Sequence, residues 1–156
     1  MSLVEGVSSE NTTNRTMANI YADVELLDGL KAKLNFGSDI QNQHRDVYVS
    51  TLTRRGGPLG GDAAVTALDR SNVLLEYTMT YDKEISENQR LTLLGGVTYQ
   101  KFFFNVFNGH ISGFPTDELM TNALNLGDTN LDDLYTNHEE NTLLSYLGRI
   151  NYTLWA

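Results

Sequence analysis

A period of two runs through this sequence and restricts it to all-β folds. In the segment NIYADVELL, residues 19–27, every second residue is apolar (Ile20, Ala22, Val24 and Leu26), and the residues between them are polar or aromatic. Successive side chains of a β-strand point to opposite faces, so the pattern predicts a strand with one apolar and one polar face. The alternation recurs in residues 30–40, 72–82, 90–102 and 143–154. We predict about five long antiparallel strands that form an up-and-down meander.

The connections between these segments alternate in length. Asp28-Gly29 is a tight-turn signal between the first two strands, and residues 83–88 form a second short polar turn. The other two connections, 41–71 and 103–142, are long, and a short helix is expected in the second one at 116–125. Short turns at one end and long loops at the other are typical of outer-membrane barrels and rare in globular domains. Alternation alone leaves open whether the apolar face meets lipid or a soluble core.

The composition excludes several functions. The net charge is -9 and the 11 basic residues are scattered, which argues against a nucleic-acid partner because phosphate binding needs clustered Lys and Arg. The chain has no cysteine and no Gly-x-Ser-x-Gly motif, so it lacks these nucleophile signatures. Glu76 and Asp82 lie too far apart along one strand to act as a catalytic carboxylate pair. We therefore predict that the protein is not an enzyme.

Four stretches resemble one family of transporters. GLKAKLNFGSDI (29–40), LTLLGGVTYQK (91–101), SGFPTDEL (112–119) and LLSYLGRINYTL (143–154) follow the order and rough spacing seen in TonB-dependent outer-membrane transporters of the SusC/RagA type. These are the nutrient importers of Bacteroidetes. The resemblance covers about residues 17–154 and implies a segment of a barrel of about 22 strands. It implies two parts: 1–16 as an N-terminal leader in loop or disordered form, and 17–156 as a partial receptor barrel.

The resemblance also implies a function and a location. Such a chain would supply barrel wall and extracellular loops in the outer membrane, in contact with lipid, and would not be functional alone. The complete transporter would import a glycan or peptide with energy delivered through TonB, and a SusD-like lipoprotein would act as its lid. The sequence leaves the choice between oligosaccharide and peptide open. The alternative is a soluble all-β module that binds carbohydrate.

Candidate substrate contacts come from the polar faces and from one aromatic cluster. In the transporter interpretation, the expected lumen-facing residues are Lys31, Lys33, Glu76, Arg149 and Asn151. A cluster of phenylalanines at the loop end of residues 90–102 is either an interfacial girdle or a stacking surface for substrate. The members taken as substrate candidates are Phe104, Phe107 and Phe114.

One acidic segment resembles a calcium-binding loop. In DTNLDDLYTNHE, residues 128–139, Asp128, Asn130, Asp132 and Glu139 occupy ligand positions of the EF-hand template. Asp133 stands where the template requires glycine, and no pair of flanking helices is expected. The segment is therefore interpreted as a calcium site or as a solvated polar loop, and no other cofactor is expected.

Overall fold

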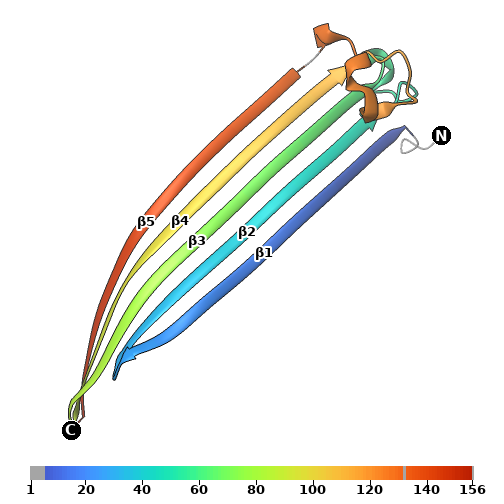
Figure 1. Cartoon of the computed structure of the whole chain (residues 1–156). Helices are drawn as coiled ribbons and strands as arrows, with labels where there is room; N and C mark the ends of the chain where they lie inside the picture. Colours follow the sequence, from blue (N-terminus) through green and yellow to red (C-terminus); the bar gives the residue numbers. More distant parts are fainter. Residues whose placement is uncertain (1–5, 132, 156) are drawn as a thin grey trace. The chain divides into compact units, whose positions relative to one another are not determined.

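Five long strands form one antiparallel sheet in chain order, β1-β2-β3-β4-β5 (Figure 1). The computed structural model describes residues 6–131 and 133–155. The strands are β1 (Val7–Leu27), β2 (Leu30–Val49), β3 (Asp62–Ser86), β4 (Gln89–Ser112) and β5 (Asp133–Leu154). The predicted all-β meander of five long strands is confirmed, with each predicted segment inside one strand.

All five strands extend further than the alternation predicts. β1 begins at Val7, so the expectation that residues 1–16 form a loop is wrong from Val7 onward, while residues 1–5 lie outside the described part. The first half of β1 carries Ser, Asn and Thr on both faces, which leaves no period-two signal. Backbone hydrogen bonds between strands do not require apolar side chains, so the pairing continues where the alternation stops.

Three 3₁₀ helices lie in the long connections: η1 (Gly57–Leu59), η2 (Met120–Leu126) and η3 (Thr129–Leu131). The helix expected at 116–125 is therefore wrong in type and start. The Thr116 hydroxyl accepts the backbone N–H of Glu118 at 3.2 Å, which makes a local turn before Met120. Ala123 has φ −142° and ψ 61°, so no regular helix passes through that residue.

The predicted tight turn at Asp28-Gly29 joins β1 to β2. Gly29 has φ 76°, a left-handed conformation that glycine adopts without steric cost. A Cβ atom at this position would lie 2.2 Å from the carbonyl oxygen of Asp82. The Gly29 carbonyl also accepts the Asp82 backbone N–H at 2.8 Å, so the turn lies directly against β3.

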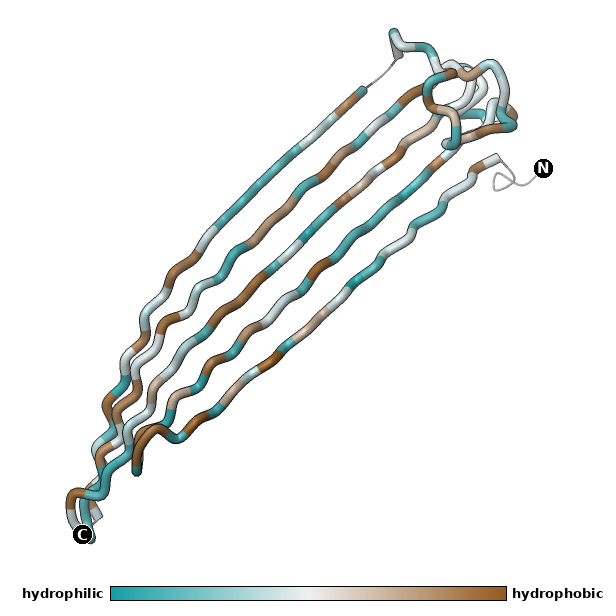
Figure 2. Tube along the Cα trace, in the orientation of Figure 1, coloured by the Kyte–Doolittle hydropathy of each residue, from teal (hydrophilic) through white to brown (hydrophobic). Residues whose placement is uncertain are grey.

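The chain divides into two compact units, which we describe separately. The strand unit comprises Thr16–Ile40, Ser71–Phe103 and Glu140–Ala156. Brown and teal residues alternate along its strands in Figure 2. None of its described residues is buried, and Ile20, Tyr146 and Ile150 are 69%, 78% and 74% exposed. This unit therefore presents an apolar face with no protein core against it.

The loop unit comprises Met1–Arg15, Gln41–Arg70 and Phe104–Glu139, and it contains the buried cluster. Tyr48 from β2, Ala63 from β3 and Phe114 after β4 form the cluster, with Ile111 and Leu124 packed against it. The rings of Tyr48 and Phe114 meet edge to face with centroids 5.6 Å apart. The segment that carries η2 is therefore folded onto the ends of β2, β3 and β4.

Candidate functional site

Polar side chains gather on one face of the strand unit. Asn35 Nδ2 donates to Glu76 Oε2 at 2.8 Å, which places β2 and β3 side chains on the same face. Lys33 Nζ lies 3.9 Å from Asp23 Oδ2 and 5.1 Å from the ring centroid of Tyr21. Both members of that ion pair are about half exposed, so it contributes little to stability. Alternation places Lys31 beside Lys33 on this polar face.

Arg149 and Asn151 belong to the same face by a separate line of evidence. A Cβ atom built on Gly96 of β4 would lie near side-chain atoms of Thr78 and Leu147. Leu147 therefore shares the face of Thr78, and alternation along β5 adds Arg149 and Asn151 to it. The five predicted lumen-facing residues thus lie on one face, and whether that face contacts substrate stays a prediction.

A hollow of about 650 Å³ lies on the strand unit near the turns. The sequence patterns did not predict a site at this position. Arg90 holds Asp82 with two hydrogen bonds, Nε to Oδ1 at 2.7 Å and the terminal nitrogen to Oδ2 at 2.5 Å. Lys31 and Glu25 also line the hollow. The sequence did contain one signal for this hollow: Asp82 and Arg90 flank the short turn at 83–88, so a hairpin there brings their opposite charges together.

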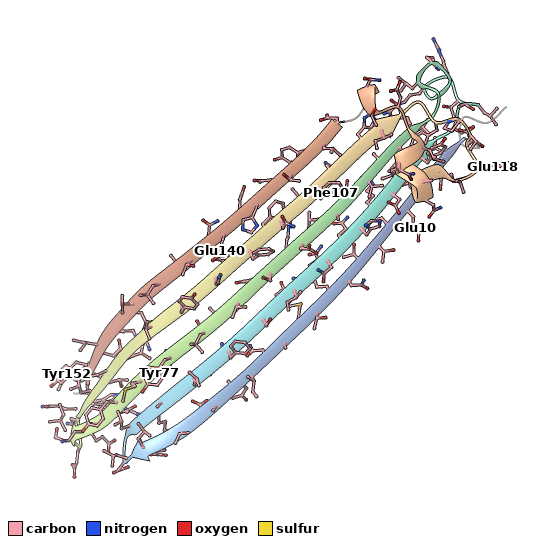
Figure 3. All side chains as sticks on the ribbon, turned by 45° about the horizontal axis from the view of Figure 1, so that its top comes forward. Glu10, Tyr77, Phe107, Glu118, Glu140 and Tyr152 are labelled. Atoms are coloured by element: carbon pink, nitrogen blue, oxygen red, sulfur yellow. The ribbon has the colours of Figure 1, made fainter. Side chains whose placement is uncertain are left out.

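The three candidate phenylalanines have different environments. The guanidinium of Arg70 lies over the ring of Phe104, 5.2 Å from the ring centroid, in a cation–π contact. Phe107, labelled in Figure 3, stands on β4 an odd number of residues from Phe104 and therefore on the opposite face. Phe114 is 8% exposed inside the buried cluster. The interpretation of Phe114 as a stacking residue is wrong, because its ring is covered by Tyr48.

Asp117 joins the η2 segment to the end of β2. Its carboxylate accepts the Tyr48 hydroxyl at 2.7 Å, the Ser50 hydroxyl at 2.8 Å and the Thr51 hydroxyl at 2.6 Å, together with the Thr51 backbone N–H. Burial by itself would raise the pKa of Asp117, but these hydrogen bonds lower that pKa to about 2. Burial and the nearby carboxylate raise the pKa of Tyr48. Asp117 is therefore a charged anchor of this loop.

A second polar cluster lies at the start of β3. The Asp62 side chain is 5% exposed, and its Oδ2 accepts a hydrogen bond from Arg55 at 3.1 Å. Its other oxygen lies 2.5 Å from His110 Nε2, with a geometry that does not qualify as a hydrogen bond. The buried carboxylate thus holds Arg55 at the surface of the loop unit.

The predicted calcium ligands are only partly described. Asp128 Oδ1 accepts both the backbone N–H and the side-chain amide of Asn130, at 3.0 and 2.8 Å. Glu139 lies within β5, where it accepts a hydrogen bond from Asn137, and Asp132 lies outside the described residues. Within the described part of the chain, no group of three or more His, Cys, Asp or Glu is arranged to hold a metal. Calcium binding stays a prediction, to be checked by calcium titration calorimetry.

The described residues contain no helix long and apolar enough to cross a membrane.

Comparisons with known proteins identify relatives of this chain. No family model matches it. TonB-dependent receptor P3 of Formosa agariphila is 32% identical over 144 residues, and TonB-dependent receptor P26 of the same organism is 26% identical over 147 residues. These matches cover 92% and 93% of this chain but only 14% and 15% of the relatives. The chain therefore spans about one seventh of their length.

Solved structures show the same fold. The RagAB peptide transporter contains a chain that superposes with a TM-score of 0.87 at 24% identity, covering 97% of this chain and 17% of that one. The RagAB peptide importer in its open-open state gives the same values. An antiparallel sheet of long strands with one apolar face and one polar face is the pattern typical of an outer-membrane barrel wall. The relative at 32% identity supports recognition of this chain as a segment of a TonB-dependent receptor. The RagAB match shows that the chain shares the fold of a segment of that transporter.

Proposed function

We propose that this chain forms wall and loops of an outer-membrane, TonB-dependent importer of oligosaccharides or peptides. The observation that carries the proposal is the apolar face of the strand unit. Many of its large apolar side chains, with Ile150 among them, are exposed, and no described residue of that unit is buried. Bilayer lipid is the environment in which such a face is stable, and the polar face then borders the lumen.

The relatives support the transport part of the proposal. The two Formosa proteins are named as TonB-dependent receptors, and RagAB is named as a peptide transporter and importer. We propose the same role for the complete protein, with TonB as the energy-coupling partner and a SusD-like lipoprotein as the lid over the loops. We expect this chain to have a role in transport and not in catalysis, because the relatives are named as receptors and transporters. Its polar residues would contribute to the lining of the substrate path.

The soluble carbohydrate-binding module is less well supported. Such a module would cover its apolar strand faces with a second layer, as a sandwich does. In the strand unit no second layer covers the side chains of Ile20 and Tyr146. The exposed apolar face therefore favours the membrane interpretation over the soluble one.

The test uses the complete gene in a Bacteroidetes host. Membranes separated by density should contain the protein in the outer-membrane fraction. Its deletion should abolish uptake of one class of oligosaccharide or oligopeptide, and loss of TonB should have the same effect. A protein recovered in the soluble fraction, or uptake that continues without TonB, would contradict the proposal.

A further inference from the structure

We propose that a hollow in the loop unit binds the carboxyl end of a peptide whose last residue is apolar. The inference rests on the proposed import function and narrows its substrate to peptides. The hollow has a volume of about 530 Å³. The residues that line it are Val7, Val47, Val49, Thr53, Arg54 and Arg55.

The hollow lies on the face opposite the buried cluster. Val47 and Val49 flank Tyr48 along β2, and the Tyr48 ring packs against Phe114. Alternation therefore turns both valines to the other side of the sheet. Gln43 lies four residues before Val47 on the same face of β2, and its side-chain amide donates a hydrogen bond to Asn11 of β1. The valine floor is a fixed feature of two paired strands.

The rim of the hollow is positively charged in an acidic chain. Arg54 and Arg55 both line it, whereas the whole chain has a net charge of -9. Arg55 is held by the buried Asp62 at 3.1 Å, which compensates its charge. Arg54 is exposed and makes no hydrogen bond or ion pair within the described part of the chain. Arg54 is thus the group available for a carboxylate, which a guanidinium binds with two parallel hydrogen bonds.

The remaining chemistry favours a peptide over a sugar. An apolar ligand group that packs on the valine side chains leaves water, which contributes a favourable free energy of roughly 25 cal/mol per Å² of apolar surface buried. The lining contains no aromatic ring for stacking on a sugar, and its one hydroxyl is engaged: Thr53 donates to the Ser50 carbonyl at 2.8 Å. Sugar hydroxyls placed over the valine floor would lose water without gaining hydrogen-bond partners there. An apolar side chain next to a terminal carboxylate matches both halves of the hollow.

The experiment measures equilibrium binding to the complete protein in detergent, by fluorescence anisotropy. The probes are fluorescein-labelled Gly-Ser-Gly-Leu with a free carboxylate, the same peptide as its amide, and Gly-Ser-Gly-Ser with a free carboxylate. We expect the leucyl acid to bind about tenfold more tightly than either other probe, the ratio expected for one charge-assisted hydrogen-bonded contact. Arg54→Gln should abolish the preference for acid over amide, and Val47→Thr should reduce the preference for leucine over serine.

Arg45→Gln is the matched control, because Arg45 is an exposed arginine of β2 that does not line the hollow. It should leave both preferences unchanged. Equal affinity for acid and amide in the wild type, an unchanged preference in Arg54→Gln, or no binding of any probe would overturn the inference.

Uptake by cells separates this inference from the proposed function. If TonB-dependent uptake persists and Arg54→Gln changes no preference, the hollow is not the subsite and the import function stands. If the binding preferences hold but no uptake depends on TonB, the import function fails and the subsite stands.

Discussion

The hydroxyl of Tyr48 donates a hydrogen bond of 2.7 Å to Asp117 Oδ1, so the end of β2 is joined to the segment that follows β4. The same tyrosine packs its ring edge to face against Phe114. One residue therefore connects the buried cluster of the loop unit to its charged anchor. This pairing makes the segment around η2 an ordered part of the loop unit.

We expect Asp117→Asn to loosen this segment. The amide offers one acceptor oxygen where the carboxylate offers two, and its NH₂ group would face the hydroxyls of Ser50 and Thr51. A loss of about 1–3 kcal/mol in the free energy of local opening is expected. Hydrogen exchange of residues 113–119 would measure it as faster exchange. Glu118→Gln, an exposed neighbour, should leave exchange unchanged, and equal effects of the two variants would contradict the anchor role.

The anchor should tolerate mild acid. The pKa of Asp117 is lowered to about 2 from its usual 3.8, so its charged form contributes stability above pH 3.8. That stability is lost as the pH falls toward 2. Exchange of residues 113–119, corrected for intrinsic rates, should stay constant from neutral pH to about 5 and accelerate only in stronger acid. In Asp117→Asn this acid-dependent step should be absent, and a transition near neutral pH would show that another group controls the segment.

Arginine at two neighbouring positions of β5 should have opposite outcomes. Ile150 lies on the exposed apolar face and Asn151 on the polar face. If the apolar face meets lipid, Ile150→Arg should cost about 2–4 kcal/mol near the membrane midplane, while Asn151→Arg should be tolerated. The measurement is the amount of folded barrel in outer-membrane fractions of cells that make the complete protein. Equal tolerance of the two variants would reject the lipid-facing assignment. Loss of folded barrel in Asn151→Arg, with Ile150→Arg tolerated, would show that the face carrying Asn151 meets lipid.

Gly29 should not accept a side chain. Its φ of 76° and the carbonyl of Asp82, 2.2 Å from a Cβ atom built there, both oppose alanine. Gly29→Ala should cost at least about 1–2 kcal/mol from the left-handed backbone alone. The measurement is the urea midpoint of the folded barrel. Gly95→Ala is the control, because a Cβ atom at Gly95 meets nothing within 4 Å. Similar midpoints for both variants would contradict the role of this turn.

Local sequence patterns are sufficient to predict which residues form strands with two different faces. The alternation at 143–154 and the turn at Asp28-Gly29 depend only on local backbone geometry, so they are readable without a structure. The same pattern brought Lys31, Lys33 and Glu76 onto one face. The stretches that resemble TonB-dependent transporters added a prediction of family, and the two relatives named as TonB-dependent receptors bear it out.

The conformations of the long connections and of the strand ends depend on contacts between segments that are far apart in the sequence. The polar residues 8–15 join the sheet because β1 stays paired with β2 far from the Asp28-Gly29 turn, and no local pattern encodes that pairing. Phe114 became a core residue because Tyr48 and Ala63, far away in sequence, lie against it. The four donors on Asp117 and the arginine rim of the valine hollow likewise need segments that meet only after folding. Contacts of this kind depend on the three-dimensional path of the chain, so alternation predicted the wall and not its loops.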